Sequence, residues 1–360
     1  MTRANPPLTP KEFSSRVVDW YHQHGRQHLP WQQTRTPYRV WISEIMLQQT
    51  QVTTVIPYFE RFMSTFPDVH ALALAHIDTV LQHWSGLGYY ARGRNLHKAA
   101  QIIHSELNGE FPRTIEGLCE LPGIGRSTAG AILSFGYGIS APILDGNVKR
   151  TLSRYAGVPG WPGLPAVAKN LWEIAENYTP TTEIQAYTQA MMDLGAMICT
   201  RTQPKCETCP LQSACVAFHT ERIADFPGKK PSRNKPVKHT YVLLLTRADQ
   251  KILLEQRPPV GIWGGLWSLP ECHSLDDIPH FSREKLGLTV EPQDFLPEFR
   301  HTFSHYHLDI SPVVCRVMKT SSRVAMPGPH KWVESGQLSQ YGLPAPIKFL
   351  LSSFLQEQNA

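Results

Sequence analysis

The stretch Leu121–Phe135, LPGIGRSTAGAILSF, decides the fold of the first part of the chain. A proline and two closely spaced glycines, Gly123 and Gly125, lead directly into an apolar helix. Glycine allows tight turns and close approach of a ligand to the backbone. A helix that begins immediately after such a turn directs free N–H groups and the positive end of its dipole outward, where an anion can bind. The stretch therefore predicts either an anion-binding helix-hairpin-helix at about 118–136 or an ordinary packing contact between two helices.

The sequence pattern differs between the first and the second part of the chain. Its 360 residues exceed the size at which one core usually stops growing, so we expect two domains. Apolar residues recur at helical spacing across residues 1–226, and Thr36 and Pro37 are typical of a helix cap and a first helical residue. Further helices are expected at His76–Trp84, Asn95–Leu107, Ser127–Phe135, Ala166–Glu176 and Tyr187–Ile198.

The second part of the chain, residues 240–360, has the sequence pattern of an α+β domain. The segment Thr240–Pro258, TYVLLLTRADQKILLEQRP, reads as strand, turn and strand. His305–Val317, HYHLDISPVVCRV, reads as a further strand pair, and Pro344–Leu355, PAPIKFLLSSFL, as a closing helix. Residues 227–239 join the two domains as an extended basic linker, either merely soluble or in contact with phosphates; its cations are Lys229, Lys230, Arg233, Lys235 and Lys238.

Charge and composition restrict the setting in which the protein works. The net charge of +5 and the pI near 8.8 are compatible with a polyanionic partner. No apolar run is long enough to cross a membrane, and the N-terminal segment lacks the apolar core of an export signal. Seven cysteines, an odd number, favour a reducing compartment over a disulfide framework. We therefore expect a cytoplasmic protein.

Four of the cysteines form a compact cluster at 199–215. The segment CTRTQPKCETCPLQSAC has the spacing C-x6-C-x2-C-x5-C, made by Cys199, Cys206, Cys209 and Cys215. Four thiolates in one loop can surround a zinc ion or an iron–sulfur cluster, and general spacing rules do not separate these two centres. Four cysteines without a metal are the least expected alternative.

Together, these motifs resemble a known family. The cysteine spacing downstream of LPGIG, with Ile143–Arg150 (ILDGNVKR) between them, is similar to the endonuclease III superfamily of DNA glycosylases, in which that spacing holds a [4Fe–4S] cluster. Ser43–Phe62, Gly86–Ala100, Gln189–Thr200 and Phe299–His305 narrow the resemblance to the MutY-type adenine DNA glycosylases. The resemblance implies a helical glycosylase domain followed by a MutT-like (Nudix-like) domain. It also implies base excision repair of adenine paired with 8-oxoguanine or guanine in double-stranded DNA. The expected protein is then a nucleoid-associated monomer of bacterial type.

The resemblance assigns the chemistry to three residues. Breaking an N-glycosidic bond requires protonation of the leaving purine and stabilisation of the positive charge on the sugar, and two carboxyl groups can divide these tasks. Glu44 stands where the family places the acid that protonates adenine N7, and its apolar neighbours favour the protonated form. Asp145 stands where the family stabilises the sugar cation, and Asn147 positions it. Without the resemblance, Glu44 reads as a surface residue and Asp145 as a helix cap.

A missing lysine predicts where the reaction stops. Bifunctional members of the superfamily carry a lysine at position 127, whose amine attacks the sugar and leads to strand cleavage. Ser127 cannot form an imine, so we expect a monofunctional enzyme that leaves an abasic site.

A base must leave the helical stack before its glycosidic bond can be cut. By resemblance, Gln49 and Tyr89 insert near the base opposite the extruded adenine, with Thr50 and Leu87 beside them, while Arg26 and Trp31 line the adenine pocket. Gln32, Ser127 and Gln189 differ from residues in some branches of the family, so the shape of the pocket stays open at these positions.

The second domain is expected to recognise the lesion. Nudix hydrolases hold magnesium on a glutamate-rich helix, but Arg283–Leu288 (REKLGL) offers only Glu284, so pyrophosphatase activity is disfavoured. Phe303, Ser304 and His305 are expected to contact 8-oxoguanine, whose altered Hoogsteen edge carries an N7–H donor. Two further alternatives are a pyrimidine-lesion glycosylase with lyase activity, which Ser127 opposes, and a non-catalytic iron–sulfur DNA-binding or redox-sensing protein, which the two carboxyl groups oppose.

Overall fold

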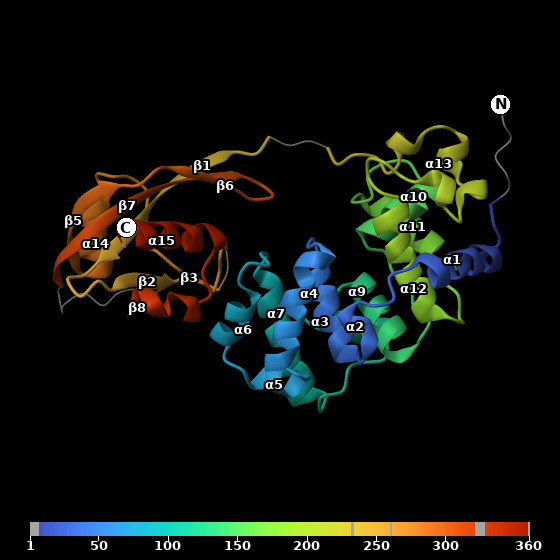
Figure 1. The fold of residues 1–360 in the computed structure, drawn as a ribbon, viewed down its shortest axis with the longest axis horizontal. Coiled ribbons are helices and arrows are strands. Elements are labelled where there is room, and N and C mark those ends of the chain that lie inside the picture. Colours follow the sequence, from blue (N-terminus) through green and yellow to red (C-terminus); the bar gives the residue numbers. More distant parts are fainter. Residues whose placement is uncertain (1–6, 232–233, 260, 321–327, 359–360) are drawn as a thin grey trace. The chain divides into compact units, whose positions relative to one another are not determined.

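A computed structural model describes residues 7–231, 234–259, 261–320 and 328–358. These residues form two compact units, one made of 7–74 and 95–231 and the other of 75–94 and 234–358. The first is helical and the second contains a sheet, as the sequence predicts (Figure 1). Ser232 and Arg233 of the predicted linker lie outside the described residues. No helix in the described ranges has the length and apolar character needed to cross a membrane.

The helical unit is built from short helices joined by tight turns. Its α-helices are α1 (Pro10–His24), α2 (Pro30–Gln33), α3 (Pro37–Leu47), α4 (Val52–Thr65), α5 (Val69–Leu74), α8 (Ile115–Cys119), α9 (Arg126–Ala131), α10 (Gly146–Ala156), α11 (Pro165–Tyr178), α12 (Ile184–Asp193) and α13 (Val216–His219). Its other helical segments are the π-helices η1 (Ile132–Tyr137) and η2 (Leu194–Ile198) and the 3₁₀ segments η3 (Cys206–Thr208), η4 (Gln212–Ala214) and η5 (Ile223–Asp225). Helix α7 (Ala91–Glu106) runs from the second unit into the first.

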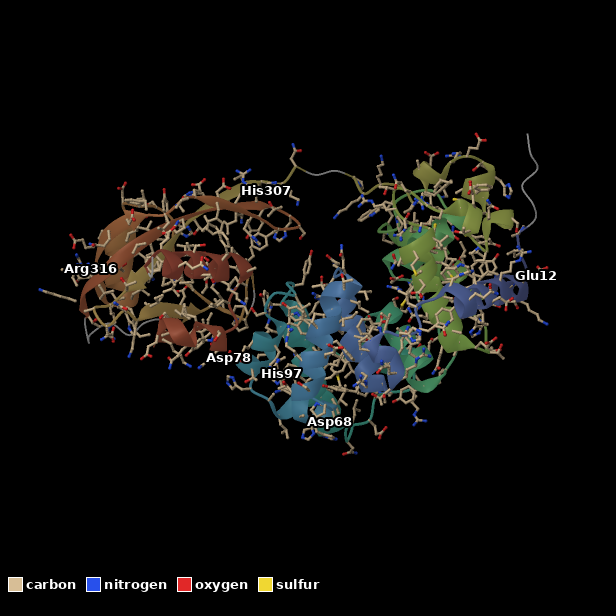
Figure 2. The ribbon with its side chains drawn as sticks, in the orientation of Figure 1. Glu12, Asp68, Asp78, His97, His307 and Arg316 are labelled. Atoms are coloured by element: carbon tan, nitrogen blue, oxygen red, sulfur yellow. The ribbon has the colours of Figure 1, made fainter. Side chains whose placement is uncertain are left out.

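Helix starts follow the local sequence. Thr36 caps α3 by accepting a hydrogen bond from the Arg39 amide, and Pro37 is the first helical residue, as predicted. At α1, Thr9 and Glu12 form a reciprocal capping box, with Glu12 at the beginning of the helix (Figure 2). These caps satisfy N–H groups that have no partner within the helix.

The glycine-containing stretch at 121–135 belongs to a helical hairpin. Helix α8 ends at Cys119, and α9 begins at Arg126 after a turn in which Gly123 has a φ of +82°. A Cβ on Gly123 would lie 2.9 Å from the Cβ of Asn95, so this position requires glycine for both its backbone angle and its space. The hairpin packs beside α3, since both α9 and η1 contact that helix.

The core of the helical unit is aromatic and aliphatic. Trp41, Phe59 and Phe62 are fully buried, and the Trp41 ring meets Phe111 edge to face at 5.4 Å. The packing fixes α3, and with it the side chains that α3 directs away from the core.

The second unit contains an eight-stranded sheet. Its strands are β1 (Val237–Thr246), β2 (Ile252–Gln256), β3 (Trp267–Ser268), β4 (Glu271–Cys272), β5 (Leu288–Phe295), β6 (Phe299–Thr302), β7 (His307–Thr320) and β8 (His330–Val333). The main order is β3-β2-β1-β7-β5, in which β1 and β7 are parallel, while β4, β6 and β8 pair with β1, β7 and β2. The unit also contains α6 (Ile77–Trp84), α14 (Ile278–Leu286), the 3₁₀ segment η6 (Ser335–Gln340) and α15 (Ala345–Gln358).

The expected strand, turn and strand at 240–258 is confirmed by β1 and β2, and the expected closing helix by α15. The strand pair expected at His305–Val317 is wrong, because β7 is one continuous strand, with His307 and Arg316 toward its two ends (Figure 2). Pro312 lies inside this strand. It lies where the antiparallel partner of β7 changes from β5 to β6, so its missing N–H costs no antiparallel ladder bond.

Candidate active site

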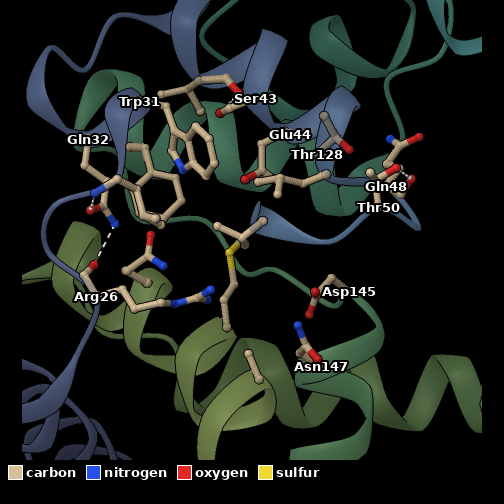
Figure 3. A pocket seen from close by; sticks show the side chains of 18 of the residues that line it. Arg26, Trp31, Gln32, Ser43, Glu44, Gln48, Thr50, Thr128, Asp145 and Asn147 are labelled. Atoms are coloured by element: carbon tan, nitrogen blue, oxygen red, sulfur yellow. Dashed lines mark hydrogen bonds between the residues drawn. The ribbon is translucent and has the colours of Figure 1, made fainter. Parts of the chain in front are cut away.

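One cavity of about 700 Å³ opens in the helical unit. Its walls come from the α1–α2 turn, α2, α3, the turn before α4, the start of α9, the start of α10 and the end of α12. Figure 3 shows Glu44 on one wall and Asp145 and Asn147 on another. The structure thus brings together two carboxyl groups that lie 101 positions apart in the chain.

Glu44 comes from α3, between the buried residues Ser43 and Ile45. Burial, with a smaller contribution from the negative charge of Asp145, raises the pKa of Glu44 to about 8. The Glu44 carboxyl is therefore mainly protonated at neutral pH and can donate a proton into the cavity.

Asp145 has a different environment, because it is the N-cap of α10. Its Oδ1 accepts a hydrogen bond from the Val148 amide at 2.8 Å. Burial raises the pKa of Asp145, but backbone N–H groups and the cations Arg150 and Lys149 act in the opposite direction. The helix N-terminus and these cations favour the carboxylate, so the two acids of the cavity are suited to different roles.

Ser127 ties the hairpin to the loop that carries Asp145. Its Oγ accepts a hydrogen bond from the Leu144 amide at 2.9 Å. On the same helix, a Cβ on Gly130 would lie 2.2 Å from the Pro142 carbonyl oxygen, so only glycine allows the loop to run this close. The serine therefore has a positioning role that its sequence context does not predict.

Asn147 is held from the opposite side. Its Oδ1 accepts a hydrogen bond from Arg150 at 2.9 Å, and Arg150 also donates to the Cys199 carbonyl at 2.7 Å. A Cβ on Gly195 would lie 2.4 Å from the Cβ of Asn147. The π-helix η2 therefore packs directly on the start of α10 and links it to the cysteine loop.

The four clustered cysteines line one small, separate cavity together with Arg154. Arg154 is 4% exposed and donates to the Cys199 sulfur at 3.4 Å and to the Thr200 carbonyl at 2.7 Å. Burial raises the pKa of Cys209 to about 12, so its thiolate form requires a nearby positive charge such as that of a bound metal. Four sulfur donors facing one cavity fit an iron–sulfur cluster, which is wider than a single ion. Among the described residues, no three potential ligands converge on a single metal ion.

Asp193 does not line the cavity but holds two residues that do, Arg26 and Gln189, and the sequence did not reveal this role. It is fully buried and accepts hydrogen bonds from the Arg26 backbone amide (2.7 Å), from Nε and Nη2 of the Arg26 guanidinium (2.9 and 2.6 Å), and from Nε2 of Gln189 (2.9 Å). Gln32 adds a hydrogen bond to the Arg26 carbonyl at 2.9 Å (Figure 3). An aspartate inside the apolar run QAMMDLGAM was the available signal.

Most of the expected pocket residues line this one cavity: Arg26, Trp31, Glu44, Gln49, Thr50, Ser127, Asp145 and Asn147. Trp31 is 6% exposed and also packs edge to face on Phe59, so it serves the core as well. Gln49 has a φ of +58°, a strained backbone angle for a residue other than glycine.

The remaining expected contacts lie elsewhere. Tyr89 is 53% exposed with a φ of +49°, whereas Leu87 is buried. Gly123 and Gly125 belong to the hairpin turn, where Arg126 pairs with Glu176 and stacks on Trp172. Phe303, Ser304 and His305 form the turn between β6 and β7 in the second unit.

Two family descriptions match the chain. Residues 42–177 match the family described as "HhH-GPD superfamily base excision DNA repair protein". Residues 241–353 match the family described as "NUDIX domain". The first match contains the hairpin and both cavity carboxyl groups, and the second contains most of the sheet.

Similar proteins cover nearly the whole chain. An "Adenine DNA glycosylase" of Buchnera aphidicola subsp. Acyrthosiphon pisum (strain APS) is 39% identical over 347 residues, which is 96% of this chain and 99% of that protein. A Homo sapiens protein of the same name is 34% identical over 361 residues, 82% of this chain and 65% of that protein. Among solved structures, a thermostable thymine-DNA glycosylase matches 59% of this chain and 97% of its own, with 27% identity and a TM-score of 0.53.

Proposed function

The chain belongs to the adenine DNA glycosylases, and from that premise we propose that it excises adenine paired with 8-oxoguanine or guanine and then stops at the abasic site. It is a DNA N-glycosylase of base excision repair. The observation that carries the proposed mechanism is that Glu44 and Asp145 line one cavity in different surroundings.

Glu44 is the proposed general acid. An extruded adenine in the cavity receives the Glu44 proton on N7, which turns the base into a neutral leaving group. The raised pKa of Glu44 supports this role, because the acid is still protonated at neutral pH.

Asp145 is the proposed stabiliser of the sugar cation. As the glycosidic bond lengthens, positive charge grows on the sugar, and a nearby carboxylate lowers the energy of that state. Asn147, held by Arg150, positions this end of α10, and water completes the hydrolysis. The Ser127 hydroxyl accepts a hydrogen bond from the Leu144 amide. Because a hydroxyl cannot form an imine with the sugar, this residue supports the absence of lyase activity.

The duplex is the proposed partner of both units. Arg26 and Trp31 line the pocket for adenine, while Gln49, Thr50, Leu87 and Tyr89 face the opposite base. The hairpin glycines Gly123 and Gly125 approach a phosphate, and Phe303, Ser304 and His305 read 8-oxoguanine. We propose that the protein acts as a monomer, without a membrane, in the cytoplasm.

Cys199, Cys206, Cys209 and Cys215 are the proposed ligands of a [4Fe–4S] cluster. When bound, the cluster supplies a rigid metal–thiolate cross-link of the 199–215 loop. Arg154 and Arg150 fasten this loop to α10 through the carbonyls of Thr200 and Cys199.

The test is single-turnover adenine release from a duplex with an 8-oxoguanine–adenine pair. Glu44→Gln and Asp145→Asn are expected to lose nearly all activity, whereas Glu60→Gln, an exposed glutamate on α4, keeps the parent rate. Release by Glu44→Gln at the parent rate contradicts the assignment of the acid. Strand breakage without heat or alkali contradicts the monofunctional reaction.

A second measurement addresses the lesion. Ser304→Ala is expected to weaken the preference for 8-oxoguanine over guanine more than it slows adenine release from the guanine pair. An unchanged preference counts against the 303–305 contact, and Ser352→Ala on α15 is the matched control.

A further inference from the structure

Trp263 has a backbone conformation that is rare for a large side chain. It lies in the loop between β2 and β3, has a φ of +55° and is only 8% exposed. Strained residues of this kind persist where their surroundings fix them, and they are common at ligand-binding sites. The surroundings of Trp263 therefore indicate what the strain serves.

The loop around Trp263 is closed by its own backbone. The Arg257 amide donates to the Leu266 carbonyl at 2.8 Å, and the Leu266 amide donates to the Trp263 carbonyl at 3.0 Å. The Gly265 amide donates to the carbonyls of Arg257 and Pro258 at 3.1 and 3.0 Å. These bonds hold Trp263 in one position relative to the ends of β2 and β3.

The indole packs on the hairpin formed by β6, residues 303–306 and the start of β7, here called the contact hairpin. Its ring centroid lies 5.7 Å from that of Phe303 and 6.0 Å from that of His301. Phe303 and His301 meet edge to face at 4.6 Å, and Phe303 lies 4.8 Å from Tyr306. Among the ring contacts of the described residues, Trp263 thus joins Phe303 and His301 of the hairpin from a different loop.

The same loop holds a second element of the unit. The Arg94 guanidinium donates to the Gly264 carbonyl, and a Cβ on Gly265 would lie 3.4 Å from Cδ of Arg94. Arg94 follows Tyr89 by five residues, and both belong to the same compact unit as Trp263. The loop therefore contacts both the contact hairpin and the segment that carries Tyr89. The proposed function places both of these on the base opposite adenine.

We propose that Trp263 is a positioning residue for recognition of 8-oxoguanine. It holds Phe303 in place, and its loop keeps the contact hairpin and the Tyr89 segment in a fixed relation. This inference rests on the proposed function, because it assumes that the contact hairpin reads the oxidised base. It assigns Trp263 no part in breaking the glycosidic bond.

The test compares single-turnover adenine release from an 8-oxoguanine–adenine duplex and from a guanine–adenine duplex by the full-length protein. We expect Trp263→Leu to lower the ratio of the two rates about three- to tenfold, mainly by slowing the 8-oxoguanine duplex. Trp263→Phe keeps an aromatic ring and is expected to restore most of the ratio. Trp332→Leu is the matched control, because Trp332 packs on the sheet core beneath Arg247.

A double-mutant cycle with Phe303→Leu separates positioning from a general loss of structure. If Trp263 acts through Phe303, adding Trp263→Leu to Phe303→Leu lowers the ratio little further. The proposal is overturned if the loss of the ratio in the double variant equals the product of the losses in the two single variants. It is also overturned if Trp263→Leu leaves the ratio unchanged. If Trp263→Leu melts well below the parent protein, the same cycle is run with Trp263→Met, which fills more of the space of the indole but has no aromatic ring.

The ratio of the two rates in the wild-type protein separates the proposed substrate preference from the role of Trp263. A wild-type protein without preference for 8-oxoguanine overturns both the proposed substrate and the role of Trp263. A wild-type preference that Trp263→Leu leaves intact overturns the role of Trp263 alone.

Discussion

Glu44 and Asp145 share a cavity but differ in what surrounds them. Glu44 has apolar helix around it, whereas Asp145 caps a helix and has two cations near it. A protonated acid and an ionised carboxylate can therefore coexist in a narrow range of pH.

The first prediction follows from that range. Adenine release measured well below saturation is expected to decline as pH rises through about 8, because Glu44 then loses the proton that it donates. It also declines at acidic pH as Asp145 becomes protonated. In Glu44→Gln, any residual activity lacks the alkaline decline. A wild-type rate that stays flat from pH 7 to 9 contradicts the role of Glu44.

The second prediction concerns stability. The folded state raises the pKa of Glu44 from 4.5 to about 8, so it binds a proton that the unfolded chain has already released. Stability is therefore lost as pH rises from about 4.5 to about 8, by up to about 1.4 kcal/mol per pH unit. Glu44→Gln is expected to melt higher than the parent protein at pH 8 and to differ less at pH 4.5. If the parent protein and Glu44→Gln melt at the same temperature at pH 8, the raised pKa of the buried Glu44 is contradicted.

The third prediction concerns Asp193. Asp193→Asn leaves the Arg26 guanidinium without its carboxylate, and removal of one partner of a buried pair costs about 3 kcal/mol. Both Arg26 and Gln189 line the cavity, so the loss of the Asp193 carboxylate also releases two side chains of its wall. We expect slower adenine release and a lower melting temperature. Asp19→Asn, on the exposed side of α1, is the control.

Among the elements, the π-helices η1 and η2 each contribute a residue to the cavity wall, Phe135 and Ala196. Each extends a helix by a widened turn, η1 after α9 and η2 after α12, and such segments often occur at functional sites. Segment η2 ends immediately before Cys199 and packs on Asn147 through Gly195. One short element therefore touches both the cysteine loop and the active-site wall.

The fourth prediction tests that contact. Gly195→Ala introduces a methyl group 2.4 Å from Cβ and 2.8 Å from Cα of Asn147, so the start of α10 has to shift. We expect adenine release to fall at least tenfold, because a displacement near 1 Å can cost about a hundredfold in rate. Gly336→Ala has open space around it and is the control. A parent rate in Gly195→Ala shows that Asn147 tolerates displacement.

The elements differ in how far the sequence predicts them. The start of α3 was predictable, because Thr36 and Pro37 are strong local signals. Segments η1 and η2 were predicted only as continuing helix, because their widened turns depend on packing against α3 and α10. The cavity carboxyl groups were identified through family resemblance, whereas Asp193 and Trp263 act through contacts distant in sequence and were missed.

For the whole molecule, the cavity lies entirely in one unit and the contact hairpin entirely in the other. The segment 75–94, which carries Tyr89, belongs to the second unit although it is early in the chain. The Tyr90 hydroxyl donates to the Leu343 carbonyl, and Gln82 donates to the Ser339 carbonyl at 3.0 Å. Support for this segment therefore comes from residues near the C-terminus.

The fifth prediction follows from this division. A protein that ends at residue 231 keeps the complete cavity but loses the contact hairpin and the partners of residues 75–94. It is expected to release adenine slowly from both duplexes, to bind them more weakly and to show little preference for 8-oxoguanine. Titration of each labelled duplex followed by single-turnover rates at saturation measures these effects. A fragment that keeps the full preference contradicts the recognition role of the second unit.

The hydrogen bond between Ser127 and the Leu144 amide also bears on how such enzymes diverge. A lysine at this position brings an ammonium group, which donates hydrogen bonds and accepts none, so the Leu144 N–H loses its partner. Gaining strand-cutting chemistry by one codon change thus disturbs the loop that bears the carboxylate. A variant with lysine at this position therefore needs another acceptor near the Leu144 N–H if the loop that bears Asp145 is to keep its position.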